Sequence, residues 1–307
     1  MTHIRKNLIV LLMVLIASSA FAQSGTVDTS KKLQSSILNR EMPYSVYFPP
    51  GYEESNRPYP VLYLLHGMTG KYSDWVTDGE VRRISDSAIN SGEAPEMIIV
   101  MPDGLFDAFY INNYDQSIRW EDFFYEEFIP HIESEYRVIA NRNFRAIAGL
   151  SMGGYGALYH GVKHKDKFTS VYAMSAAVLE REPLKKGEEL NEFDKSFALK
   201  TWGPINEEGY PENYKEHSVQ EMFKAMEPYK APQFGFMQGP GQAPLPKIYI
   251  DCGDDDFLLQ QNTNLVHIMK SKGYPFEFRV RDGGHTIEYW RTALEIALRF
   301  IGDDFRN

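Results

Sequence analysis

Three short stretches of this chain are almost continuously apolar, and they restrict the folds open to it most strongly. They are VLYLL at residues 61–65, MIIVM at 97–101 and KIYI at 247–250. A strand with one wetted face alternates apolar and polar residues, whereas a continuous run is typical of a strand buried on both faces. Four further strands are expected, at residues 44–48, 145–148, 170–174 and 276–280. The runs therefore predict a parallel sheet covered by helices.

Helical patterns lie between the predicted strands. Phe124, Phe128 and Ile132 are spaced four apart on one helical face, and Pro130 is expected to kink or restart that helix. Apolar side chains at 287, 290, 294, 297 and 301 form a second stripe with helical spacing. The alternation of strands and helices predicts a doubly wound, mostly parallel α/β sheet with helices on both faces.

Residues 178–245 interrupt this alternation. They have no strong strand pattern and contain GPINEEGYPENY and the start of QFGFMQGPGQAPLP, which are rich in glycine and proline. A connection of this length is usually functional or disordered. We expect an insertion with short helices before the strand at 247–251, which either caps a site or is plain loop decoration. No linker or repeat divides residues 23–307, so one domain is expected.

The chain begins with the features of a secretory signal peptide. Arg5 and Lys6 precede the apolar run LIVLLMVLIA, and the small-x-small sequence AFA ends at Ala22. The pattern predicts residues 1–22 to be a signal peptide, cleaved after Ala22, and a secreted or periplasmic product. An uncleaved membrane anchor is the alternative, but the run is about half the ~20 apolar residues that a spanning helix needs.

Charge and cysteine content exclude several other classes of protein. The formal net charge is −10, and loss of Arg5 and Lys6 would bring it to −12 (−10 − 2). Such an acidic chain is not expected to bind nucleic acid or an anionic membrane through a basic field. Cys252 is the only cysteine, so no internal disulfide can form, and its apolar setting predicts a buried core residue rather than a nucleophile.

The segment AIAGLSMGGYGAL at residues 146–158 carries the strongest chemical motif. It contains Gly149-x-Ser151-x-Gly153, with an apolar strand before it and a small-residue helical start after it. This is the strand–turn–helix context of a nucleophile elbow, in which glycines let neighbouring backbone approach. The helix that follows would point its free N–H groups at the reacting centre. An ordinary glycine-rich turn is the alternative, and Ser151 is the predicted nucleophile.

A serine hydroxyl needs a base, and the chain has eight histidines. In this architecture the chain order is serine, then acid, then histidine. His285, in RDGGHTIEYW between the last predicted strand and the last helix, is the histidine that follows a credible acid loop. His160 and His164 lie on the helix after the elbow and are expected to face away from Ser151. We therefore predict His285 to be the base.

The acid is expected in CGDDDFLL at residues 252–259, because it must follow a strand and precede a helix. These criteria leave Asp254, Asp255 and Asp256 open. The run lacks the spacing of a calcium loop, and no HExxH or CxxC pattern occurs elsewhere, so neither a metal nor another cofactor is expected.

The loop LLHGMTG at residues 64–70 is the expected second half of an oxyanion hole. The backbone N–H groups of Met68 and of Met152, the residue after the nucleophile, are the predicted donors. His66 and Gly67 of this loop, and Trp75 shortly after it, are expected to contact substrate. Trp75 and the aromatic residues of AFYINNY at 108–114 could stack on a sugar or feruloyl ring, or they could pack in the core.

Four motifs together resemble the esterase D / feruloyl esterase family, also called carbohydrate esterase family 1. They are LYLLHGMTGKYSDW, IAGLSMGGYGAL, CGDDDFL and GGHTIEYW, in the family's order, and the resemblance covers residues 33–301. The tributyrin-esterase and xylan-side-chain esterase branches look most similar, and residues 178–245 match least. The resemblance implies an α/β-hydrolase fold and metal-independent ester hydrolysis through an acyl-serine. Family members carry the acid three residues after the glycine, which implies Asp256, with Asp255 as the alternative.

The implied substrate is an ester outside the cytoplasm, because of the predicted signal peptide. Feruloyl or acetyl esters of plant polysaccharide come first, and short-chain acyl esters of the tributyrin type are the alternative. Two rivals come from other classes: an acyltransferase that uses a sugar acceptor, and a non-catalytic binding module with the same fold. The binding module is disfavoured because serine, acid and histidine are all present in order.

Overall fold

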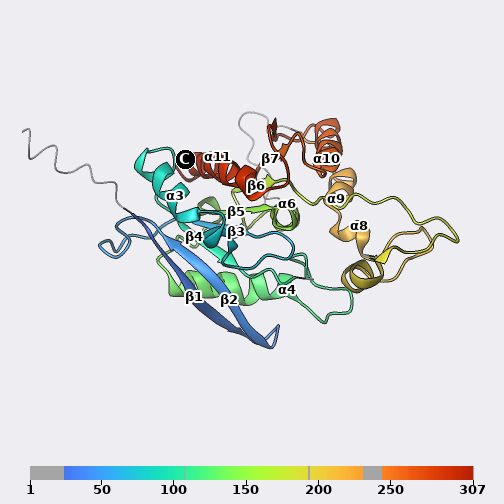
Figure 1. Cartoon of the computed structure of the whole chain (residues 1–307), viewed down its shortest axis with the longest axis horizontal. Coiled ribbons are helices and arrows are strands. Elements are labelled where there is room, and N and C mark those ends of the chain that lie inside the picture. Colours follow the sequence, from blue (N-terminus) through green and yellow to red (C-terminus); the bar gives the residue numbers. More distant parts are fainter. Residues whose placement is uncertain (1–23, 107, 193, 231–243, 307) are drawn as a thin grey trace, which may run out of the picture.

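The computed structural model describes residues 24–106, 108–192, 194–230 and 244–306, and the predicted signal peptide lies outside them. The described residues form an eight-stranded sheet with the spatial order β1-β2-β4-β3-β5-β6-β7-β8 (Figure 1). The strands are β1 (Thr26–Ser35), β2 (Arg40–Phe48), β3 (Val61–Leu65), β4 (Ile98–Pro102), β5 (Arg145–Leu150), β6 (Ser170–Met174), β7 (Lys247–Gly253) and β8 (Glu277–Arg281). Strands β3 to β8 are parallel, while β1 and β2 run antiparallel to their neighbours.

The central strands are the apolar runs of the sequence. Every residue of β3, β4, β5 and β6 is buried, which confirms the doubly wound, mostly parallel sheet. The sequence reading missed β1 and found only the second half of β2. β1 is a polar edge strand with mostly exposed or half-exposed side chains, and it forms through its ladder with β2 rather than through burial.

Helices cover both faces of the sheet. On one face α3 (Val81–Asn90) and α11 (Ile287–Phe305) pack against alternate strand residues, and the stripe predicted for the last helix faces this core. On the other face lie α6 (Met152–Lys163), α10 (Leu259–Ser271) and the helical segment from residue 120 to residue 135. No helix among the described residues is long and apolar enough to cross a membrane.

The helix that contains Pro130 restarts rather than ends. It begins as α4 (Trp120–Asp122), widens into the π-helical segment η1 (Phe123–Phe128) and returns to α-helix as α5 (Ile129–Glu135). Pro130 stands in the first turn of α5. The Ile129 N–H donates to the Phe124 carbonyl, so the helical hydrogen bonds continue into α5, and the proline omits one bond of this series just where π-helical spacing returns to α-helical spacing.

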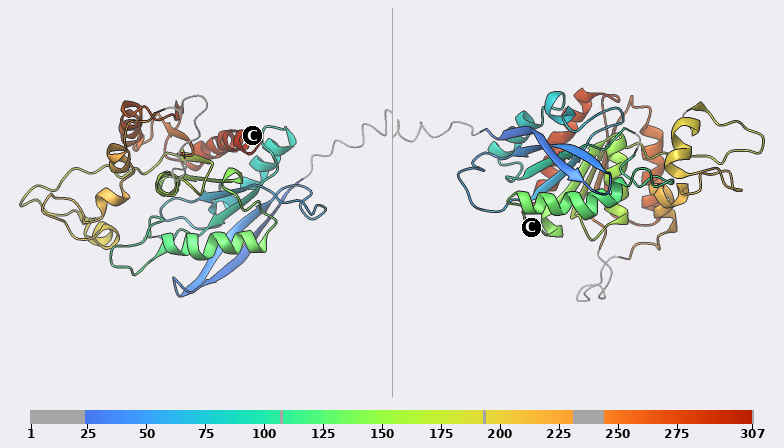
Figure 2. Two further views of the ribbon diagram at one scale, coloured as in Figure 1. Left: turned by 180° about the vertical axis from the view of Figure 1, so that it is seen from behind. Right: turned by 90° about the horizontal axis from the view of Figure 1, so that it is seen from below.

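Within the insertion at 178–245, residues 180–217 lie at the opposite end of the molecule from the β1–β2 hairpin, apart from residue 193, which is not described (Figures 1 and 2). The described part of the insertion contains short helical segments and no strand, as predicted. They are η3 (Asp194–Ala198), α7 (Leu199–Trp202), α8 (Tyr214–His217) and α9 (Val219–Ala225). Most of the segment QFGFMQGPGQAPLP falls outside the described residues.

Candidate active site

Ser151 stands on the turn between β5 and α6, with φ 53° and ψ −115°. This conformation is rare for a residue with a side chain, and it is held by backbone hydrogen bonds. The Ser151 N–H donates to the Met174 carbonyl at 2.8 Å, and the Ala177 N–H donates to the Ser151 carbonyl at 2.9 Å. A Cβ on Gly153 would lie 2.6 Å from the His66 carbonyl oxygen, so only glycine allows the turn to sit against the β3 loop.

Ser151, His285 and Asp256 form a continuous hydrogen-bonded chain across three separate loops. His285 Nε2 lies 3.0 Å from Ser151 Oγ, and His285 Nδ1 lies 2.9 Å from Asp256 Oδ2. An ionised carboxylate only accepts hydrogen bonds, so Nδ1 carries the ring proton and Nε2 accepts from the serine hydroxyl. This arrangement allows a base to take the proton of Ser151. Neither His160 nor His164 joins it, since their rings contact the Tyr110 carbonyl and Glu121.

The carboxyl group of Asp256 is buried and held in its ionised form. Burial raises its pKa, but hydrogen bonds from His285, the Leu258 N–H and Ser175 outweigh burial, and the pKa lies below its usual value. The Leu258 N–H donates to Oδ1 at 2.8 Å, which leaves Oδ2 for the histidine. The anion therefore has a donor on each oxygen.

The other two aspartates of the run have different surroundings. Asp254 Oδ1 accepts the Gly283 N–H at 2.9 Å, so this side chain ties the acid loop to the loop that carries His285. Asp254 is nevertheless exposed to solvent, and it does not cap α10, which begins only at Leu259. Asp255 is exposed as well.

Ser175 and Trp290 support the acid, and sequence reasoning found neither. Ser175 is fully buried at the end of β6, where its hydroxyl accepts the Trp290 indole N–H at 3.2 Å. Its hydrogen bond to Asp256 lowers the pKa of that carboxyl group. The Trp290 ring also meets His285 edge to face, with centroids 4.8 Å apart. Trp290 belongs to the stretch GGHTIEYW, but Ser175 follows an ordinary strand and has no motif around it.

A cavity of about 400 Å³ opens beside Ser151 and His285. The β3 loop and α11 line it, through residues that include Gly67, Met68 and Trp290. Met152 is the first residue of α6, so its N–H has no acceptor within that helix. Met68 lines the cavity and Met152 directly follows Ser151, so both residues stand near the reacting centre. Their role as oxyanion-hole donors stays a prediction.

His66 and Trp75 also line this cavity, but their polar atoms are already engaged. His66 Nε2 accepts the Gly104 N–H at 2.8 Å, and Nδ1 lies 2.8 Å from the Gly67 carbonyl oxygen. The Trp75 indole N–H donates to the Leu65 carbonyl at 3.1 Å. These contacts hold the β3 loop in place, while substrate contact by His66, Gly67 and Trp75 stays a prediction.

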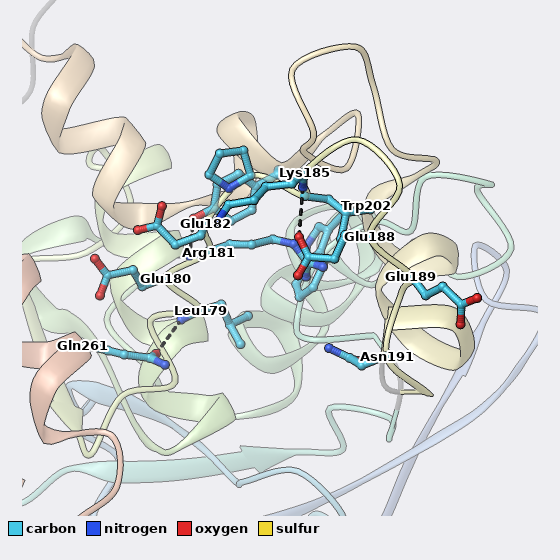
Figure 3. Close-up of a pocket in the computed structure, with 13 residues that line it drawn as sticks. Leu179, Glu180, Arg181, Glu182, Lys185, Glu188, Glu189, Asn191, Trp202 and Gln261 are labelled. Atoms are coloured by element: carbon cyan, nitrogen blue, oxygen red, sulfur yellow. Dashed lines mark hydrogen bonds between the residues drawn. The ribbon is translucent and has the colours of Figure 1, made fainter.

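A larger cavity, about 560 Å³, lies at the insertion rather than at Ser151 (Figure 3). Its walls come mainly from residues 179–191, with Trp202, Tyr214 and Gln261, and include neither Ser151, Asp256 nor His285. Among residues 178–192, 194–230 and 244–245, none lines the cavity beside Ser151. Within AFYINNY, Phe109 and Tyr110 are fully buried, so core packing describes them.

Comparisons with known proteins show the family of the chain. The family model described as "Putative esterase" matches residues 35–301. An acetyl esterase of Caldicellulosiruptor saccharolyticus is 26% identical over 242 residues, which are 78% of this chain and 82% of that protein. An endo-1,4-beta-xylanase/feruloyl esterase of Xylanibacter ruminicola is 34% identical over 116 residues, 36% of this chain and 16% of that protein.

A solved structure of a ferulic acid esterase is 35% identical to this chain, with a TM-score of 0.73. The match covers 92% of this chain and 99% of the other. The family model and this relative each extend over most of the sequence, and the residues matched by the family model include the three loops that carry Ser151, Asp256 and His285. The chain therefore belongs to the esterase/feruloyl esterase family of α/β-hydrolases and is a carboxylic ester hydrolase.

Proposed function

We propose that the protein is a secreted serine esterase that removes feruloyl or acetyl groups from plant polysaccharide through an acyl-serine intermediate. The observation that carries the proposal is the chain of two hydrogen bonds from Asp256 through His285 to Ser151, at 2.9 and 3.0 Å. The catalytic roles below follow from this geometry and from general triad chemistry.

In the first half-reaction, Ser151 Oγ attacks the ester carbonyl carbon while His285 Nε2 takes the hydroxyl proton. Asp256 holds the Nδ1–H tautomer and stabilises the imidazolium that forms. The carbonyl oxygen gains charge and accepts the N–H groups of Met68 and Met152, each typically contributing about 3 kcal/mol to the transition state. The C–O bond then breaks, and His285 returns the proton to the departing alcohol.

In the second half-reaction, water takes the place of the alcohol. His285 removes a proton from water as its oxygen attacks the acyl-serine carbonyl. The tetrahedral adduct collapses, the carboxylic acid leaves, and Ser151 regains its proton from His285.

Two observations support the substrate class. The relatives named above are acetyl, feruloyl and xylanase-linked esterases. The cavity beside Ser151 is lined by the carboxylates Asp74 and Asp78 and, among the described residues, by no lysine or arginine. A neutral ester therefore fits this cavity better than an anionic one. The predicted signal peptide supports an extracytoplasmic substrate.

The test uses the chain beginning at residue 23 and its Ser151→Ala variant. We expect the wild type to hydrolyse methyl ferulate or p-nitrophenyl acetate and to release the same acid from feruloylated or acetylated xylan. Ser151→Ala should lose at least a thousandfold in kcat. Unchanged hydrolysis by Ser151→Ala would contradict the mechanism, and activity on the small esters without release from xylan would contradict the substrate class. N-terminal sequencing of the exported protein should begin at Gln23.

A further inference from the structure

Phe257 is the most exposed large apolar side chain in the described part of the chain, with 75% of its surface accessible. It directly follows Asp256, and its ring packs on the His285 imidazole with centroids 4.6 Å apart. A phenylalanine left in water gains almost nothing from the hydrophobic effect, so an exposed ring beside a reacting group points to a ligand.

Asp255 stands two residues before Phe257 in the same loop and is also exposed. A Cβ built on Gly284, the neighbour of His285, would lie 4.0 Å from the Asp255 Cβ, so Asp255 stands beside the loop that carries His285. Its two neighbours in the run already have partners, since Asp254 holds the Gly283 N–H and Asp256 holds His285. No hydrogen bond or ion pair of the Asp255 carboxylate occurs within the described residues. An unpaired carboxylate and an exposed aromatic ring in one loop complement a sugar, whose hydroxyl groups donate and whose C–H face is apolar.

The chemistry decides which half of the ester reaches Phe257. His285 must return its proton to the leaving oxygen, so the alcohol begins within hydrogen-bond distance of Nε2. The imidazole meets Trp290, which lines the cavity, and Phe257, which does not line it and is exposed to solvent. A compact acyl group can enter a cavity of about 400 Å³, whereas an alcohol that continues into a polymer has to remain in the open.

We propose that Phe257 and Asp255 form the subsite for the alcohol half of the ester, and that this half is a sugar ring. The ring lies with a C–H face on Phe257 and donates a hydroxyl group to Asp255. The inference rests on the proposed esterase function and adds what binds the leaving group. It also gives the three aspartates of the run three separate tasks.

The experiment compares two esters of the same acyl group, one of methanol and one of an arabinofuranosyl or xylopyranosyl residue in an oligosaccharide. The measured quantity is the ratio of kcat/KM for the sugar ester to kcat/KM for the methyl ester. Phe257→Leu keeps apolar cover over His285 but removes the aromatic face, and we expect the ratio to fall about tenfold. Asp255→Asn loses a charged acceptor, and we expect a fall of about fivefold.

Tyr229→Leu is the matched control for loss of an exposed aromatic ring. Tyr229 is 37% exposed and packs on Tyr274, and neither residue lines the cavity beside Ser151. Its ratio should equal that of the wild type.

Two results would overturn the proposal. One is a ratio in Phe257→Leu and Asp255→Asn that equals that of the wild type; if both esters are then hydrolysed more slowly by the same factor, Phe257 only shields His285. The other is a wild type that hydrolyses neither ester, which would also remove the esterase proposal on which this inference rests. A wild type active on both esters, with variants whose ratio equals its own, leaves the esterase proposal intact and refutes the sugar subsite alone.

Discussion

The Asp256→Asn substitution replaces one carboxylate oxygen by an amide nitrogen and leaves the shape of the side chain almost unchanged. In the wild type, Oδ1 accepts the Leu258 N–H at 2.8 Å and Oδ2 accepts from His285 Nδ1 at 2.9 Å. The amide oxygen of the variant has to stay on the Leu258 N–H, because an amide nitrogen there would face another donor. The amide nitrogen then faces His285 Nδ1.

This orientation determines the size of the effect. A donor facing Nδ1 favours the tautomer with its proton on Nε2, which can donate to Ser151 Oγ but cannot take its proton. The same change of tautomer in a serine protease triad lowers kcat by about 10⁴. We expect a loss of 10³ to 10⁴, equivalent to about 4–5.5 kcal/mol in the barrier.

Steady-state hydrolysis of p-nitrophenyl acetate or methyl ferulate measures the loss, and a thermal unfolding curve verifies that the variant folds. Asp254→Asn is the matched control, since its amide oxygen can still accept the Gly283 N–H. We expect this control to stay within about twofold of the wild type. Similar losses in the two variants, or a loss below about tenfold in Asp256→Asn, would refute the assignment of the acid.

Two further predictions follow from buried groups. Ser175→Ala removes the hydroxyl group that contacts Asp256 and Trp290. Loss of a hydrogen bond worth about 1 kcal/mol should lower kcat about fivefold in the same ester-hydrolysis assay. An unchanged kcat would contradict this role of Ser175. Burial lowers the pKa of His160 from 6.5, its ordinary value, to about 3 in the folded protein. Between pH 6.5 and pH 3 only the unfolded chain therefore takes up a proton on this ring, and the free energy of unfolding should fall as the pH drops through this range. The slope should approach about 1.4 kcal/mol per pH unit in urea unfolding at pH 7, 6 and 5, and an equal slope in His160→Gln would contradict this origin.

The parts of the fold that could be predicted from the sequence are those where burial or backbone conformation restricts the residue type. The strands β3 to β6 are buried on both faces, so their sequences are apolar except for the first residues of β5 and β6, Arg145 and Ser170, and are easy to recognise. Gly153 approaches the β3 loop so closely that a side chain would clash, and this requirement marks the turn at Ser151. By contrast, β1 pairs through its backbone at a sheet edge, where many polar residues serve equally well.

The choice among the three aspartates illustrates why the rest could not be predicted. The side chains are chemically identical, so the sequence alone offers no reason to prefer one, and a resemblance had to supply Asp256. In the structure the choice follows from the backbone. A Cβ on Gly253 would overlap the Gly283 carbonyl oxygen, so the acid and histidine loops touch at two glycines.

That contact sets the direction of each carboxylate. The Asp255 N–H donates to the Gly283 carbonyl, and Asp254 accepts the Gly283 N–H, so both residues hold Gly283 of the histidine loop. Only the next residue is then free to turn inward beneath His285. Asp256 reaches the imidazole because Asp254 and Asp255 fix the loops in register, and Asp255 can do so through its backbone while its side chain remains exposed. The division of work among three equal residues therefore arises from packing between loops that are about 30 residues apart in sequence, and no local pattern records it.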